Sequence, residues 1–119
     1  MATVRYIVND VDAAQAFYES LGFALVRRPG PIAILQRDDL ELWIAGPGTS
    51  AQRPMPDGRK PEPGGWNRFV IEVESIEATV AALRNAGASF RNDIVVGPGG
   101  SQILVEDPSG NVVEIFQLA

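Results

Sequence analysis

The spacing of apolar residues predicts a strand and then a helix at the start of the chain. Residues 3–8 alternate between apolar and polar side chains, as a half-buried strand does. Asp10 or Asp12 is suited to cap the helix that follows, and Gly22 is suited to end it. Apolar residues on one face of this helix are Ala14, Phe17, Tyr18 and Leu21. The first part of the chain is therefore a βαβββ module, whose other strands are predicted over residues 24–27, 32–37 and 40–45.

The second half of the chain repeats this order with an offset of 65 residues. Matching positions carry the same residue or charge: Val8 and Val73, Asp12 and Glu77, Ala13 and Ala78, Ala16 and Ala81, Gly22 and Gly87. Such repetition is typical of two copies of one supersecondary unit. We expect Ser75 to cap the second helix and Asp107 to Gly110 to form a hairpin turn. The second helix has an apolar stripe of Ile76, Val80 and Leu83, and the strands are predicted over residues 68–73, 89–94, 101–106 and 111–118.

A segment rich in proline and glycine separates the two modules. Residues 46–65 contain five of the nine prolines, five glycines and no apolar periodicity. We predict that this segment links module one, residues 1–45, to module two, residues 66–119, and that it borders a binding pocket. Trp66 directly follows the segment, and we expect it to be buried against the sheet or a partner subunit.

Composition narrows the possible functions. The chain has 119 residues, 45% of them hydrophobic, so we expect a single domain; no membrane span or signal peptide is expected, which favours the cytoplasm. A net charge of −5 and a single lysine argue against a nucleic-acid partner. The chain contains no His and no Cys, which excludes Ser-His-Asp and Cys-His catalysis and the commonest nitrogen and sulfur ligands of metals.

Four predicted strands have one apolar face and one mixed face. The apolar faces, expected to meet the helices, carry Val4, Tyr6 and Val8; Leu40, Leu42 and Ile44; Phe69, Ile71 and Val73; and Val113 and Ile115. The mixed faces carry Thr3, Arg5 and Ile7; Glu41 and Trp43; Arg68, Val70 and Glu72; and Glu114 and Phe116. If the sheet curls, the mixed faces line a concave pocket, and if it stays open, they are wetted by solvent. Alternation alone leaves both arrangements open.

Two stretches carry a family resemblance. These are residues 6–18 with the following Leu21-Gly22-Phe23, and residues 106–115 near the end of the chain. Together with the paired modules, they make the chain similar to the glyoxalase, bleomycin-resistance and extradiol-dioxygenase superfamily, the vicinal oxygen chelate fold. The resemblance covers all of the chain except residues 46–65. It implies an α+β fold in which two βαβββ modules form a curled mixed sheet with the helices on the outer face.

The resemblance also locates a metal site. Metal enzymes of this superfamily hold a divalent ion with four residues, and the corresponding positions here are Thr3, Glu41, Arg68 and Glu114. Thr3 is a poor ligand, and Arg68 is a cation that repels a metal ion. We therefore expect no metal cofactor. Arg5 and Arg68 can instead neutralise the two carboxylates, or one arginine can remain available for an anionic oxygen of a ligand.

The favoured function is that of a metal-free protein that binds a small aromatic or anionic molecule in the concave pocket, as bleomycin-resistance members bind drug. The expected ligand contacts are Thr3, Arg5, Trp43, Trp66, Arg68 and Phe116. The alternative is a metal-free lyase or isomerase with Glu41 or Glu114 as the catalytic base, and a divalent-metal lyase or dioxygenase is less favoured. Each module leaves a sheet edge to be covered, and the resemblance implies a homodimer.

Overall fold

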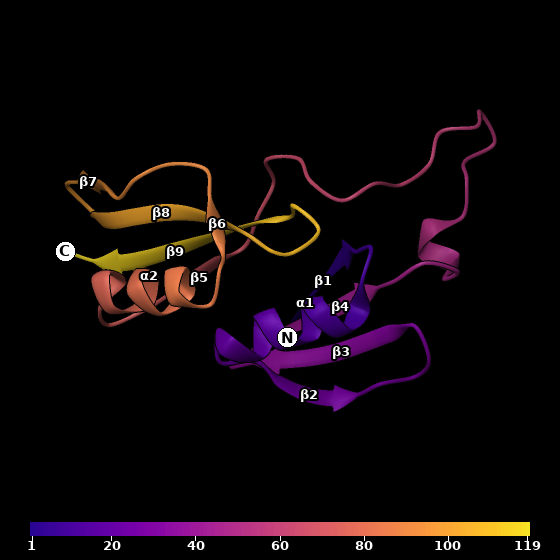
Figure 1. Ribbon diagram of the computed structural model, residues 1–119, viewed down its shortest axis with the longest axis horizontal. Coiled ribbons are helices and arrows are strands. Elements are labelled where there is room, and N and C mark those ends of the chain that lie inside the picture. The colour runs from indigo at the N-terminus through magenta and orange to yellow at the C-terminus, as the bar shows by residue number, and fades with distance from the viewer. The chain divides into compact units, whose positions relative to one another are not determined.

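All 119 residues are described by the computed structural model, in which the chain folds as two units, Met1–Gly64 and Gly65–Ala119 (Figure 1). Each unit contains one α-helix packed on one mixed sheet. The α+β class and the repeated order of elements are therefore confirmed. No helix of the chain has the length and apolar character needed to cross a membrane.

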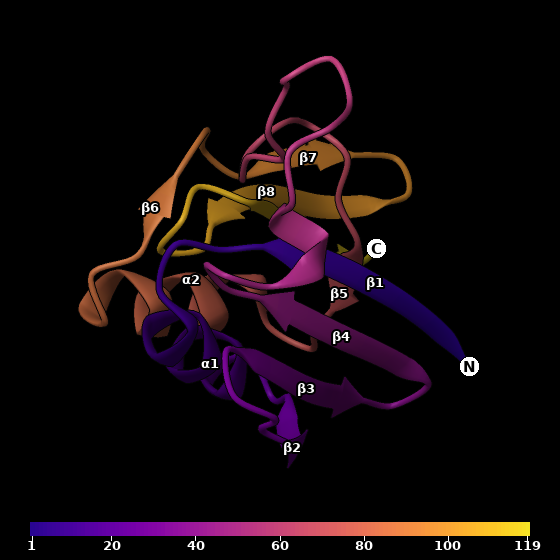
Figure 2. The same ribbon diagram turned by 90° about the vertical axis from the view of Figure 1, so that its right-hand side faces the viewer.

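The first unit has the predicted βαβββ order. Its elements are β1 (Ala2–Ile7), α1 (Val11–Ser20), β2 (Ala24–Arg27), β3 (Ile32–Arg37) and β4 (Leu40–Ala45). The strands lie in the order β1-β4-β3-β2, with β1 parallel to β4 and the other neighbours antiparallel. Helix α1 covers one face of this sheet (Figure 2). Tyr18 of α1 is fully buried and meets the rings of Tyr6, Phe17 and Phe23 edge to face.

The second unit follows the same plan with one strand more than predicted. Its elements are β5 (Val70–Glu72), α2 (Ile76–Asn85), β6 (Ser89–Phe90), β7 (Val95–Gly97), β8 (Gly100–Glu106) and β9 (Val112–Leu118). β5 pairs with β9 in parallel, β9 pairs with β8 antiparallel, and both β6 and β7 pair with β8. The predicted turn between Asp107 and Gly110 joins β8 to β9.

The ends of the two helices reproduce the sequence repeat. Asp10 and Ser75 each accept a hydrogen bond from the backbone N–H three residues later, at 3.1 and 3.2 Å. Gly22 and Gly87 follow the helices with φ of +88° and +85°, the left-handed conformation that glycine adopts without steric cost. The expected caps and stops are confirmed, and Asp10 rather than Asp12 is the cap of α1.

The strand predicted over residues 89–94 ends early, so this prediction is wrong beyond Phe90. Asn92 Oδ1 accepts a hydrogen bond from the backbone N–H of Leu104 at 2.9 Å. A side chain thereby replaces the backbone carbonyl that a continuing strand would offer to β8. The chain pairs with β8 again only from Val95, as β7.

Burial follows the predicted apolar faces in both units. The most deeply buried of these residues, each at most 2% exposed, are Val8, Leu42, Ile44, Ile71, Val113 and Ile115. On the opposite faces, Thr3 and Arg5 are exposed, whereas Glu41 and Trp43 are half-buried. Each sheet therefore has one face committed to its helix and one face that carries polar and aromatic groups.

The proline-rich segment is attached to the first sheet where it begins. A short 3₁₀ helix, η1 (Ser50–Gln52), lies within it. Gln52 Nε2 donates hydrogen bonds to the backbone carbonyls of Val8 at 2.9 Å and Ala45 at 3.0 Å. Val8 directly follows β1, and Ala45 is the last residue of β4. Gln52 therefore holds the loop at the carboxyl end of both strands.

Candidate functional site

The mixed face of the first sheet brings four predicted site residues together. Thr3 stands beside Glu41 and Arg5 beside Trp43 in the parallel register of β1 and β4. Trp43 Nε1 donates a hydrogen bond to Glu41 Oε1 at 2.6 Å, which fixes the plane of the indole. The guanidinium carbon of Arg5 lies 5.1 Å from the centroid of the Trp43 ring, within the range of a cation–π contact. We call these four residues the Trp43 cluster.

Arg5 is the uncommitted cation of the Trp43 cluster. It takes part in none of the five ion pairs of the chain and in no side-chain hydrogen bond. Its guanidinium is held only by the ring of Trp43, so its N–H donors can reach water or an oxygen of a ligand. Glu41 is committed through one carboxylate oxygen, and the other has no hydrogen-bond partner.

In the second unit, Arg68 is committed to Glu114. Arg68 Nε and Nη2 donate to Glu114 Oε1 at 3.1 and 2.9 Å, and Arg68 Nη1 donates to the carbonyl of Trp66 at 3.3 Å. The side chains of Arg68 and Glu114 are 29% and 11% exposed, so the guanidinium neutralises a largely buried carboxylate. Phe116, two residues beyond Glu114 on β9, lies on the same strand face and is half-buried.

Trp66 is held in position without being buried. Its ring lies 4.5 Å from the guanidinium carbon of Arg91. Arg91 is itself fixed by hydrogen bonds to Glu106 at 2.8 Å and to the carbonyls of Gly65 and Gly110. Trp66 nevertheless remains 68% exposed, so the prediction that it is buried against the sheet is wrong. Stacking on an arginine orients the indole while most of it stays in contact with solvent.

The residues at the positions that the family resemblance assigns to a metal ion do not fit a divalent cation in either unit. In the first unit, the two positions are Thr3 and Glu41. Glu41 supplies one carboxylate, and Thr3 adds at most a weak hydroxyl ligand. In the second unit, the guanidinium of Arg68 already bonds Oε1 of Glu114 and places a positive charge beside it. Nowhere in the chain do three or more His, Cys, Asp or Glu side chains gather closely enough to hold a metal ion.

Sequence reasoning missed two side chains that share the face of Trp43. The antiparallel register of β3 and β4 places Ile34 beside Trp43, and that of β2 and β3 places Arg27 beside Ile34. A β-bulge between Leu25 and Arg27 shifts the register of β2. No sequence signal marks this bulge, because the extra residue, Val26, resembles any other strand residue.

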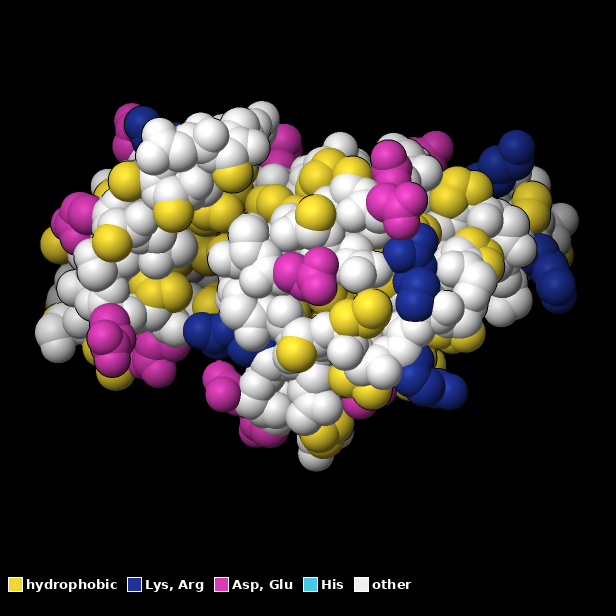
Figure 3. All heavy atoms as spheres, turned by 60° about the horizontal axis from the view of Figure 1, so that its bottom comes forward, with side chains coloured by type: hydrophobic (Ala, Val, Ile, Leu, Met, Phe, Trp, Pro, Cys, Tyr) yellow, Lys and Arg dark blue, Asp and Glu magenta, His cyan; other side chains and the backbone are white.

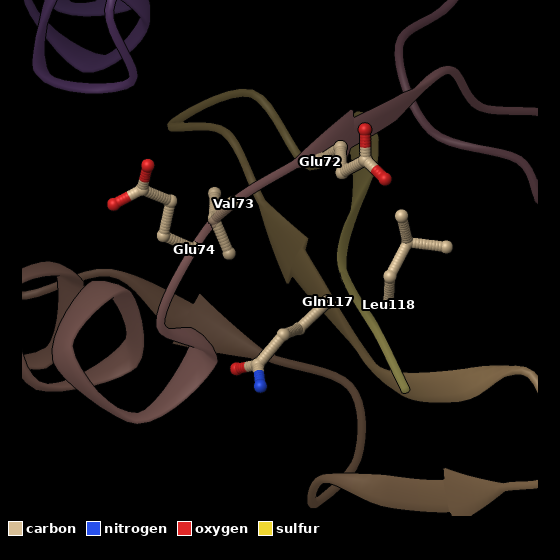
Figure 4. A pocket seen from close by; sticks show the side chains of 5 residues that line it. All are labelled: Glu72, Val73, Glu74, Gln117 and Leu118. Atoms are coloured by element: carbon tan, nitrogen blue, oxygen red, sulfur yellow. The ribbon is translucent and has the colours of Figure 1, made fainter.

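A surface hollow in the second unit lies away from the predicted site residues. It measures about 420 Å³ and is found near the carboxyl ends of β5 and β9 (Figure 4), where it is lined by Glu72, Val73, Glu74, Gln117 and Leu118. Gln117 points toward the start of α2, and its Oε1 accepts a hydrogen bond from the N–H of Ile76 at 2.8 Å. The carboxylates of Glu72 and Glu74 point away from each other (Figure 4), so they form no joint binding group.

The chain is similar to known proteins in both sequence and fold. Residues 1–115 match the family model of the Glyoxalase/Bleomycin resistance protein/Dioxygenase superfamily. The structure of lactoylglutathione lyase from Agrobacterium tumefaciens is similar with a TM-score of 0.72 and 20% identity over 98% of this chain and 92% of that one. The antibiotic binding protein TnmS3 from Streptomyces sp. CB03234 gives 0.72 and 24% identity, over 98% and 93% of the two chains. A search of curated proteins finds no match. Identities this low show the shared fold alone.

Proposed function

The chain belongs to the glyoxalase/bleomycin resistance protein/dioxygenase superfamily, and we propose that it is a cytoplasmic, metal-free protein that binds a small aromatic or anionic molecule on the mixed faces of its sheets. The ion pair between Arg68 and Glu114 carries this proposal. Both residues stand at positions where metal enzymes of the superfamily hold their ion. A guanidinium in this place supplies the positive charge that the carboxylate requires.

A metal ion at this position would have to displace Arg68 from Glu114. The displaced guanidinium would then lie beside a second cation in a partly buried setting, where charge repulsion is weakly screened. Ligand affinity is therefore expected from direct contacts. In the first unit, Trp43 offers a stacking surface and Arg5 offers hydrogen-bond donors; in the second unit, Trp66 and Phe116 offer stacking surfaces.

The two structural neighbours have different functions. One is a lactoylglutathione lyase and the other an antibiotic binding protein. Because both share the fold of this chain at similar TM-scores, the fold does not decide between catalysis and binding. The side chains at the metal positions support binding over metal-dependent catalysis.

One observation favours a second candidate, a metal-free lyase or isomerase. Glu41 Oε2 has no hydrogen-bond partner, and the uncommitted cation Arg5 belongs to the same cluster. A carboxylate with a free oxygen can take a proton from a carbon beside a substrate carbonyl, and a nearby guanidinium can stabilise the negative charge that this leaves on the carbonyl oxygen. Conversion of a bound compound is the criterion that separates this candidate from a binding protein.

A ligand screen in EDTA tests the proposed function. We expect aromatic compounds that bind to raise the Tm of the EDTA-treated protein, since a ligand at 100 times its Kd stabilises the native state by about 2.7 kcal/mol. Adding Zn²⁺, Ni²⁺ or Mn²⁺ is expected to leave the set of binding compounds unchanged. Compounds that stabilise the protein only in the presence of a metal would contradict the proposal. Chemical conversion of a bound compound would favour the enzyme.

A further inference from the structure

We propose that the first sheet carries a subsite for the oxyanion of an aromatic ligand, formed by Arg5 and Arg27 on either side of Trp43 and Ile34. This inference rests on the proposed function and narrows its ligand to one class. The ligand is a flat aromatic molecule with a carboxylate or a similar anionic group. We call Arg5, Trp43, Ile34 and Arg27 the arginine row.

The arginine row crosses all four strands of the first sheet. Arg5 of β1 stands beside Trp43 of β4, Trp43 beside Ile34 of β3, and Ile34 beside Arg27 of β2. Neighbouring strands are about 4.8 Å apart, so the backbones of the two arginines are separated by roughly 14 Å. Figure 2 shows the four strands in this order, with α1 on one face. The half-buried ring of Trp43 and the buried side chain of Ile34, which is 6% exposed, therefore lie between two cations.

Both arginines of the row lack an acceptor. Five of the ten cationic side chains form ion pairs, namely Arg28, Arg37, Arg59, Arg68 and Arg91. Arg5 and Arg27 form none, and no hydrogen bond engages either guanidinium. A guanidinium has five N–H donors in a planar fork that matches the two oxygens of a carboxylate. The row thus presents two unfilled sites for an oxyanion.

The charge of the arginine row differs from that of the whole protein. The chain has a net charge of −5, and charged side chains of both signs are dispersed over the face shown in Figure 3. The row itself carries two positive charges and no carboxylate. The net charge of the protein repels an anionic ligand, whereas the two arginines of the row attract it. An anion is therefore expected to bind at the row rather than elsewhere on the surface.

Glu41 determines where the anionic group of the ligand lies. It stands in the adjacent row, beside Thr3 and Gln36, and holds the indole N–H of Trp43. Its charge disfavours an oxyanion directly over Trp43. The ring of the ligand is therefore expected against the exposed part of Trp43, and its oxyanion at one of the two arginines.

Three probes that share a naphthalene ring test this inference: 2-naphthoate, 2-naphthamide and 2-naphthylmethylamine. Their affinities can be measured in EDTA from the fluorescence of the tryptophans. We expect 2-naphthoate to bind about tenfold more tightly than the amide, because a hydrogen bond between a guanidinium and a carboxylate is stronger than one to a neutral amide. Arg5→Gln or Arg27→Gln is expected to weaken 2-naphthoate about tenfold at whichever arginine holds it, and to leave the amide unchanged.

Two further variants separate charge and geometry from effects on folding. Arg84→Gln removes another cation without an ion pair, on α2 beside the ring of Phe90, and should change no affinity. Arg5→Lys keeps the charge but loses the planar fork, so it should retain only part of the affinity if Arg5 holds the oxyanion. Circular dichroism of each variant shows whether the fold is kept.

The outcomes distinguish the inference from the proposed function. Equal binding of 2-naphthoate and 2-naphthamide, or full affinity for 2-naphthoate in the Arg5→Gln/Arg27→Gln double variant, overturns the arginine row while leaving metal-free binding intact. Tighter binding of 2-naphthylmethylamine than of 2-naphthoate would likewise overturn the arginine row and leave metal-free binding intact. Failure of all three probes to bind contradicts both.

Discussion

Replacing Arg68 with methionine is expected to lower the free energy of unfolding by about 3 kcal/mol. The substitution keeps an unbranched apolar side chain of similar reach but removes both hydrogen bonds to Glu114. Because the Glu114 side chain is only 11% exposed, its carboxylate would then be buried without a cation. Urea unfolding followed by circular dichroism measures the change.

An exposed ion pair provides the control for this prediction. Arg28 pairs with Asp12 at 2.8 Å, but the Asp12 side chain is 87% exposed. Arg28→Met is therefore expected to cost less than about 1 kcal/mol. The double variant Arg68→Met/Glu114→Leu should recover most of the lost stability, because it leaves no unpaired charge. Equal losses for Arg68→Met and Arg28→Met would show that the buried pair has no special role.

Gly100→Ala is expected to cost about 3 kcal/mol through backbone strain and overpacking. Gly100 begins β8 with a φ of +152°, a conformation that residues with a Cβ rarely adopt. A Cβ there would lie 2.9 Å from Cζ of Phe116 and would also overlap the backbone carbonyl oxygen of Gln117. Relief of these overlaps requires β8 and β9 to separate, and β9 carries Glu114. Thermal and urea unfolding both report the loss.

The preceding residue is a matched control for Gly100. Gly99 has no atom within 4 Å of the position of an added Cβ, and its φ lies outside the left-handed range. Gly99→Ala is therefore expected to change the free energy of unfolding by less than about 0.5 kcal/mol. If the two alanine variants lose the same stability, the close approach of β9 to Gly100 is not what constrains this position.

The repeated modules could be predicted because their signals are local. Asp10 and Ser75 act on backbone groups three residues away, and Gly22 and Gly87 end helices through their own conformation. Strand faces follow from alternation within a few residues. Such features require no knowledge of what lies elsewhere in the chain.

The candidate site could be predicted only in part because its pairings are distant in sequence. Arg5 and Arg68 both lie on mixed faces, and alternation does not show which of them has a partner. Arg68 is neutralised by a residue 46 positions away, whereas Arg5 remains unpaired. Arg27 joins the face of Trp43 through a bulge, and Trp66 is oriented by Arg91, 25 positions later in the chain.

Calorimetric titration of the EDTA-treated protein with Zn²⁺, Ni²⁺ and Mn²⁺ tests most directly whether Arg68 takes the place of a metal ion. The guanidinium of Arg68 bonds Glu114, and Thr3 adds only a weak ligand. We therefore predict no uptake of any of the three ions at micromolar concentrations. Uptake of one ion per chain with micromolar affinity, reversed by EDTA, would contradict this account.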